Sequence, residues 1–113
     1  MKKVEAIIRP SKLKDVQRGL KEADIPCITV VPVKGTGLQK SYSERYRGTE
    51  QSMILQTRVM IMCVVSDEHL EKCISVIKEN ASENQVGDGK IFIYHVEEAI
   101  RLSTGVRGKE AIL

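Results

Sequence analysis

Two short glycine segments, each ending in a lysine, carry the residues of this chain best suited to binding an anion. They are Gly35-Thr36-Gly37-Leu38-Gln39-Lys40 and Val86-Gly87-Asp88-Gly89-Lys90. Without a Cβ, glycine lets backbone N–H groups close around a phosphate, and the lysine adds a positive charge. Alone, Gly-Asp-Gly is more typical of a plain turn than of a ligand site. The second segment with the same pattern favours two lips of one anion pocket.

The sequence contains no residue pattern that indicates an enzyme. Lys90 and Cys27 are conceivable nucleophiles and His69 a conceivable base, but His69 is far in sequence from both glycine segments and begins a predicted helix. No Ser/His/Asp set or carboxylate pair emerges. We therefore predict a binding protein that is not an enzyme, with at most trace hydrolysis of ATP.

Length and composition set the class of protein. The chain has 113 residues, of which 42% are hydrophobic and 4% aromatic, and it has no Trp. This suits one compact domain over residues 1–113. The formal net charge is +3 and the charges are interspersed. Few aromatic rings and a small excess of positive charge argue against nucleic acid as a partner and fit a small anionic ligand better.

The cysteines and the N-terminal segment indicate the compartment. Cys27, Cys63 and Cys73 are odd in number and widely spaced, so we expect buried free thiols in a reducing compartment. No CxxC pair is present, and the sequence predicts no metal site formed by the protein alone. No signal peptide or membrane-spanning run is apparent. We expect a cytoplasmic protein.

The hydrophobic periodicity predicts alternating strands and helices. Strands are expected at 4–8, 28–33, 58–65 and 90–96, with Pro32 favouring an edge position for the second strand. A first helix is expected to be capped by Ser11, to bury Leu13, Val16, Leu20 and Ala23, and to be stopped by Pro26. A second is expected to begin at Ser66-Asp67-Glu68, to bury Leu70, Cys73, Ile74, Ile77 and Ala81, and to precede a polar loop at 82–89. A short helical turn is expected at 97–102 before a C-terminal tail at 102–113.

This order is that of an α+β fold, the ferredoxin-like βαββαβ motif with a long loop between strands 2 and 3. Both helices would cover one sheet face and leave the other uncovered. We therefore expect an oligomer. The long segment at 36–55 shows no sustained period, and its Tyr42, Tyr46, Arg45 and Arg47 favour a recognition loop over a disordered insertion.

Several segments together resemble the PII nitrogen-regulatory signalling proteins, nearly from end to end. They are Glu5-Ala6-Ile7-Ile8-Arg9-Pro10, Lys34-Gly35, Gln39-Lys40, Tyr46-Arg47-Gly48, Val64-Val65-Ser66-Asp67, Val86-Gly87-Asp88-Gly89-Lys90-Ile91-Phe92, Val96-Glu97-Glu98, Ile100-Arg101, Thr104-Gly105 and Arg107-Gly108. The resemblance implies a homotrimer with one nucleotide cleft at each subunit interface. We expect the two glycine turns to meet there across a subunit boundary.

The resemblance also implies the ligands, ATP and ADP, with Mg²⁺ accompanying ATP. The nucleotide-binding residues it implies are Gly35, Gly37, Gln39, Val64, Gly87, Asp88, Gly89 and Lys90, with Thr29 and Arg101 from the neighbouring subunit. Gln39 would help to hold the metal. A 2-oxoglutarate molecule would meet Gln39, Lys40, Arg58 and Gly87. The resemblance leaves open whether this oxoacid binds and whether ATP or ADP is preferred.

The same resemblance assigns the segment 36–55 to the loop with which the family contacts its targets. Tyr42, Tyr46 and Arg47 would contact the partner, and Arg47 matches the residue that plugs an ammonium channel in the family. An ammonium transporter, glutamine synthetase or a nitrogenase-related protein would each fit, and a membrane would be met only through a transporter. Gln51 stands where the family often has a tyrosine that is sometimes modified by nucleotidyl transfer, so no such modification is expected there.

Several positions depart from the family pattern near the expected ligand. Met62 stands where a glutamate is usual, Ser103 where an arginine is common, and Arg58 where a lysine is usual. Glu83 replaces a threonine beside the phosphate turn, and we expect its carboxylate to repel phosphates. Two hypotheses follow: a nucleotide-sensing regulator, or a divergent interaction module or inhibitor whose metabolite binding is weakened or lost.

Overall fold

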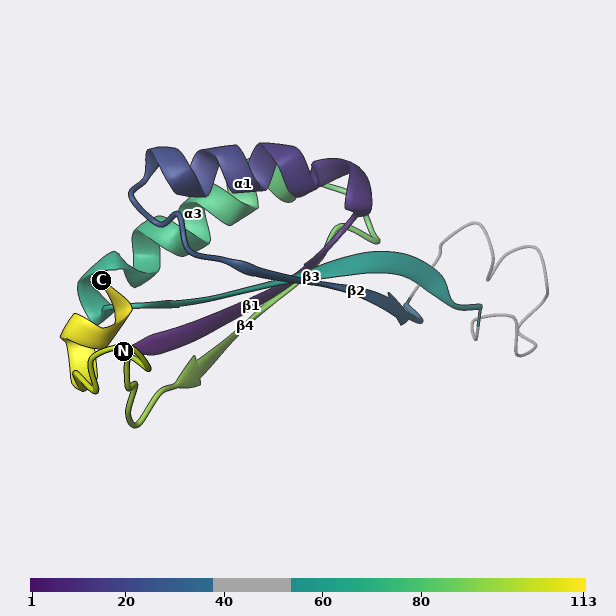
Figure 1. Cartoon of the computed structure of the whole chain (residues 1–113). Helices are drawn as coiled ribbons and strands as arrows, with labels where there is room; N and C mark the ends of the chain where they lie inside the picture. The colour runs from purple at the N-terminus through teal and green to yellow at the C-terminus, as the bar shows by residue number, and fades with distance from the viewer. Residues whose placement is uncertain (38–53) are drawn as a thin grey trace.

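The computed structural model describes residues 1–37 and 54–113 and contains four strands, two α-helices and three 3-10 helices within them (Figure 1). The elements in chain order are β1 (Lys2–Ile8), η1 (Pro10–Lys12), α1 (Leu13–Glu22), β2 (Thr29–Gly35), β3 (Gln56–Val65), η3 (Asp67–His69), α3 (Leu70–Ala81), β4 (Gly89–His95) and η4 (Gly108–Ile112).

The strands form one antiparallel sheet in the order β2-β3-β1-β4, which confirms the predicted ferredoxin-like topology. Pro32 lies on the edge strand β2, as predicted. An edge strand pairs with a neighbour on one side only, so proline, which has no N–H to donate, is tolerated there. Both helices lie on the same side of the sheet (Figure 1). One sheet face is therefore covered and the other is not.

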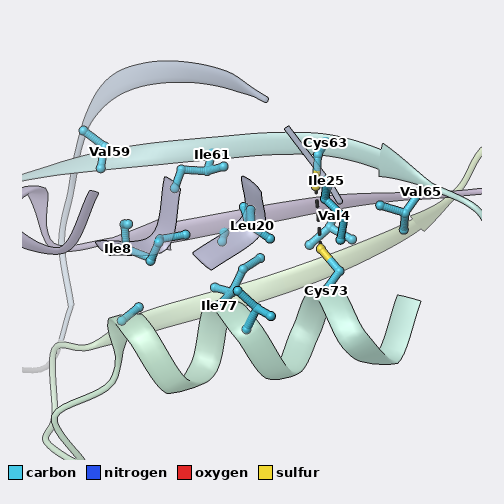
Figure 2. Close-up of a cluster of buried hydrophobic side chains, with 14 residues drawn as sticks. Val4, Ile8, Leu20, Ile25, Val59, Ile61, Cys63, Val65, Cys73 and Ile77 are labelled. Atoms are coloured by element: carbon cyan, nitrogen blue, oxygen red, sulfur yellow. Dashed lines mark hydrogen bonds between the residues drawn. The ribbon is translucent and has the colours of Figure 1, made fainter. Parts of the chain in front are cut away.

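Alternating side chains of β1 and β3 supply the core on the covered face. Val4, Ala6 and Ile8 are at most 2% exposed, and Ile61 is 1% exposed. Leu20 of α1 and Ile77 of α3 fill the space between the sheet and the helices (Figure 2). Burial of these apolar side chains stabilises the packing of the helices on the sheet. Because alternate strand residues point to opposite faces, it also fixes the register of the strands.

The first helix departs from the prediction at both ends. Ser11 does not cap it: residues 10–12 form the 3-10 turn η1, and no side chain caps either element. Pro26 does not stop it, because α1 already ends at Glu22. Asp24 takes the left-handed conformation with φ 63°, and the N–H of Ile25 bonds back to the carbonyl of Leu20. This backbone turn ends the helix.

The second helix has a slightly different buried face from the predicted one. Val76 is 7% exposed and belongs to the core, whereas Ile74 is only half-buried. Ser66 precedes η3 rather than capping a helix, and its hydroxyl instead bonds His69 Nδ1 at 2.7 Å. The α-helix starts at Leu70, after the acidic segment that the sequence predicts as its first turn.

The C-terminal segment differs from the prediction. No helical turn forms at 97–102; Ile100 instead makes a β-bridge with Arg107. The tail contains the 3-10 helix η4, and Arg101 Nη2 donates to the carbonyl oxygens of Glu110 at 2.7 Å and Leu113 at 3.1 Å. These contacts link the tail to the segment before it.

Two of the three cysteines are buried, and the prediction for the third is wrong. Cys63 and Cys73 face each other with an Sγ–Sγ distance of 3.7 Å (Figure 2). The hydrogen bond with Cys63, together with burial, raises the pKa of the Cys73 thiol. Cys27 is exposed, although its neighbour in the same segment, Ile25, belongs to the core.

The uncovered sheet face is largely apolar. The register places Ile7 beside Met60, Glu5 beside Met62 and Lys3 beside Val64 on this face. Tyr94 donates a hydrogen bond to Glu5 Oε1 at 3.2 Å, and Lys3 pairs with Glu5 at 2.9 Å. No helix within the described residues is long and apolar enough to cross a bilayer.

Candidate phosphate-binding site

Both glycine turns line one cavity of about 520 Å³ at one end of the sheet. The expectation that they meet across a subunit boundary is wrong, because both belong to the same copy of the chain. The expectation of two lips on one pocket is confirmed. The lining residues are Ile7, Gly35, Thr36, Gly37, Gln56, Arg58, Gln85, Val86, Gly87, Asp88, Gly89, Lys90 and Phe92.

The sheet topology explains why these segments meet. β2 and β4 are the two edge strands, and β2 pairs with β3 while β4 pairs with β1. All neighbouring pairs are antiparallel, so β2 ends and β4 begins at the same end of the sheet. Gly35 and Gly89 therefore close opposite sides of one cavity although they lie on opposite edges.

The backbone conformation and the close approach of β1 leave room only for glycine at position 89. Its φ is 109°, and an added Cβ would lie 1.7 Å from the carbonyl oxygen of Ile7 on the neighbouring strand. Gly87 also has a positive φ, 98°. At Gly35 and Gly37 an added Cβ would have no atom of residues 1–37 and 54–113 within 4 Å other than those of its chain neighbours, whereas at Gly89 it would overlap the backbone of β1.

The Asp88 carboxylate organises the second turn through bonds within the loop. Its Oδ2 accepts hydrogen bonds from the N–H groups of Glu83 at 2.9 Å and Gln85 at 3.1 Å and from the Ser82 hydroxyl at 2.9 Å. The bond from Gln85 is foremost in holding the pKa of Asp88 well below its ordinary range. Its charge is thus used in folding the turn.

Arg9, directly after β1, joins the same network. Arg9 Nη1 donates to Asp88 Oδ1 and to Glu83 Oε1, the latter at 3.3 Å, and Nη2 donates to the carbonyl oxygen of Val86 at 3.2 Å. Lys12 also pairs with Glu83, at 3.1 Å. The expected repulsion of phosphate by Glu83 is not supported, because its carboxylate pairs with two cations and does not line the cavity.

Among the described residues, two cationic side chains line the cavity itself, those of Lys90 and Arg58. Arg58 Nη1 also donates to the carbonyl oxygen of Thr57 at 2.8 Å. Among the other residues expected here, Gln39 and Lys40 lie outside the described residues, as do Tyr42, Tyr46, Arg47 and Gln51. A mostly apolar cavity with two cations and glycine N–H groups is suited to an organic anion.

The remaining expected ligand residues lie at the other end of the sheet. Val64 lines a second cavity of about 550 Å³, together with Cys27 and His69. Thr29 begins β2 and pairs with Met62. Arg101 is held by the carbonyl groups of the C-terminal segment. Within one chain, the expected binding residues therefore fall into two separate groups.

The sequence reasoning missed Arg9 and Ser82 as parts of the site. Arg9 is 79 residues from Asp88, and no local pattern links them. The one available signal is a positive charge directly after a predicted strand. No group of three or more His, Cys, Asp or Glu side chains that could hold a metal ion occurs within residues 1–37 and 54–113.

Fold and site together define a small ferredoxin-like domain with a cavity between two glycine turns at one end of the sheet. Residues 1–106 match the family model of the nitrogen regulatory protein P-II. The chain is 46% identical over 112 residues to the P-II proteins of Haemophilus influenzae and Rhodospirillum rubrum, covering 99% of this chain and 100% of each relative.

The solved structure of an Arabidopsis thaliana PII protein bound to citrate superimposes with a TM-score of 0.80 and 32% identity. The superposition covers 98% of this chain and 88% of that one. The chain therefore belongs to the P-II nitrogen regulatory protein family. Its relatives carry the names of regulatory proteins, not of enzymes.

Proposed function

We propose that this chain is a signal transducer that binds ATP and ADP in the cavity between the glycine turns and regulates proteins of nitrogen metabolism by direct contact. The observation that carries the proposal is the convergence of both turns on one cavity with Lys90 and Arg58. The N–H groups of Gly87 and Gly89 supply donors for phosphate oxygens, and Lys90 supplies charge.

We infer that a complete site needs a second copy of the chain. Thr29, Val64 and Arg101 lie at the opposite end of the sheet from Gly87 and Lys90. Family resemblance assigns both groups to one nucleotide. A neighbouring copy brings its second group to the first, and the apolar uncovered sheet face supplies the surface for association. The proposed assembly is a homotrimer, located in the cytoplasm.

The proposed ligands follow from the chemistry of the cavity and from the resemblance. Mg²⁺ would accompany ATP with help from Gln39, and 2-oxoglutarate would meet Lys40, Arg58 and Gly87. Arg58 contributes a planar guanidinium where relatives have a compact ammonium, which changes the geometry with which a carboxylate is met. A citrate molecule in the Arabidopsis relative is a precedent for an organic acid on this fold.

Signalling would pass through residues 36–55, whose first residues line the cavity. Thr36 and Gly37 connect the ligand directly with the base of that loop. A ligand that favours one loop conformation would favour the partner that binds it, which is a population shift. The proposed partners are an ammonium transporter, glutamine synthetase or a nitrogenase-related protein, met through Tyr42, Tyr46 and Arg47.

A second candidate is an interaction module or inhibitor with weakened metabolite binding. The contact of Arg101 with its own C-terminal carbonyl groups favours it, because those carbonyls compete with a phosphate for the guanidinium. Met62 and Ser103 also lack the charges that relatives have. Restoring both charges by Met62→Glu and Ser103→Arg separates the candidates: a large gain in affinity indicates an impaired site, and no change an altered but intact one.

Calorimetry with ADP and with Mg-ATP tests the leading proposal. We expect saturable binding to the wild type, strong weakening in Lys90→Gln, and unchanged binding in Lys72→Gln, which removes an exposed lysine of α3. Adding 2-oxoglutarate to the Mg-ATP complex tests the oxoacid. The absence of measurable binding of either nucleotide at millimolar concentration would refute the proposal in favour of the interaction module.

A further inference from the structure

The second glycine turn is held from outside by a residue of another element. Arg9 follows β1 and makes contacts with three members of the 82–89 loop: Asp88, Val86 and Glu83. We propose that Arg9 is the positioning residue of this turn, and that it orients the N–H groups of the turn toward the bound polyphosphate. This inference rests on the proposed nucleotide binding.

The contact with Val86 has a direct geometric consequence. The carbonyl of Val86 and the N–H of Gly87 belong to one planar trans peptide unit, so they point in opposite directions. Arg9 Nη2 holds that carbonyl at 3.2 Å. The N–H of Gly87 is therefore directed away from Arg9, and Gly87 lines the cavity. Without the bond, this peptide unit loses the interaction that fixes its rotation.

The contact with Asp88 acts on the rest of the turn. Asp88 Oδ1 accepts from Arg9 Nη1, while Oδ2 accepts from the N–H groups of Glu83 and Gln85. Arg9 thus fixes the carboxylate around which the loop is wrapped. Only a guanidinium can contact both sides of the turn at once, because its nitrogens lie in a rigid planar fork.

The charges around Arg9 indicate that it positions the turn and does not itself bind the ligand. Its guanidinium faces the carboxylates of Asp88 and Glu83, and Lys12 also faces Glu83. The Arg9 side chain is 22% exposed and is not among the residues that line the cavity. Its charge is already paired within the protein.

Substitution of Arg9 by lysine and by glutamine tests the proposal. Because the fork is needed and charge alone is insufficient, we expect Arg9→Lys and Arg9→Gln both to weaken ADP binding about tenfold or more in calorimetry. Arg18→Gln is the matched control, since Arg18 is exposed and pairs only with Asp15 among the described residues. Wild-type affinity in Arg9→Lys would overturn the proposal.

Amide hydrogen exchange without nucleotide separates this proposal from the proposed function. We expect the N–H groups of Glu83 and Gln85 to exchange faster in Arg9→Lys than in wild type, while core amides of β1 stay protected. Unchanged exchange at both amides would overturn the positioning role whether or not ADP binds. Faster exchange in Arg9→Lys, combined with a wild type that binds no nucleotide, would instead refute only the proposed function.

A double-mutant cycle tests whether Arg9 acts through Asp88. Asp88→Asn keeps Arg9 but removes the charge that Arg9 holds. If Arg9 acts through Asp88, the losses of ADP affinity in Arg9→Lys and Asp88→Asn will be clearly less than additive in the double variant. Fully additive losses would contradict the inference. Each affinity is measured below the unfolding temperature of the variant concerned.

Discussion

Replacing Gly89 by alanine should destabilise the protein strongly even without a ligand. An alanine at φ 109° costs about 1–2 kcal/mol in backbone conformation. The new Cβ would also lie 1.7 Å from the carbonyl oxygen of Ile7, so β4 must move away from β1 at its first residue. Loss of one ladder hydrogen bond adds about 0.5–1.5 kcal/mol. We expect a total of about 1.5–3.5 kcal/mol.

Urea unfolding followed by circular dichroism, at one fixed protein concentration, measures this loss. In thermal unfolding it corresponds to a melting temperature lower by about 4 °C for each kcal/mol. Gly37→Ala is the matched control, because it lies in the other turn and no described residue beyond its chain neighbours comes near its Cβ position. We expect its stability to stay within about 0.5 kcal/mol of wild type. Equal unfolding midpoints for Gly89→Ala and Gly37→Ala would refute the steric argument.

Three further outcomes follow from the described contacts. Glu83→Gln should change ADP affinity by no more than about twofold, because this carboxylate does not line the cavity and Arg9 keeps its bonds to Asp88 and Val86; titration calorimetry at two salt concentrations measures it, and a rise of about tenfold or more at low salt would show that Glu83 repels the phosphates. Cys73→Ser should cost about 1–3 kcal/mol in urea unfolding, because a hydroxyl replaces a fully buried thiol, whereas Cys27→Ser should be neutral. The hydrogen bond from Lys109 lowers the pKa of Glu68 to about 2 from an ordinary value of 4.5, so this pair stabilises the fold above pH 4.5 and the stabilisation is lost as the pH falls toward 2. The stability difference between wild type and Glu68→Gln should therefore shrink over that range, and a difference that grows there would be inconsistent with the ion pair.

The order of strands and helices could be predicted because periodicity reflects burial directly. Val4, Ala6 and Ile8 alternate, and Val16 and Leu20 recur at helical spacing, so one face of each element is evident from the sequence. The errors fall where backbone turns or tertiary contacts decide. Asp24 ends α1 through a left-handed turn, and η4 forms in a segment whose carbonyl groups bond Arg101.

The parts of the candidate site formed by closely spaced glycines could be predicted from the sequence. The parts that depend on contacts between residues far apart in the chain could not. The sequence identifies the two turns, but their convergence within one chain follows only from the sheet order. Arg9 could not be connected with Asp88, because the pair joins the end of an inner strand to a loop much later in the chain. The sequence shows only the charge of Glu83, because its cation partners Arg9 and Lys12 are brought to it by the fold.

The two groups of proposed binding residues lie at opposite ends of the sheet. Each copy of the chain therefore has two different ends, which we call its head and its tail. Association in which the head of one copy meets the tail of the next is heterologous, and such contacts produce either a closed ring or an open filament. In the proposed ring no head or tail would be left unfilled, so every copy would participate in two clefts. Occupancy of one cleft would then be physically connected to the next through the body of the sheet that lies between the two ends.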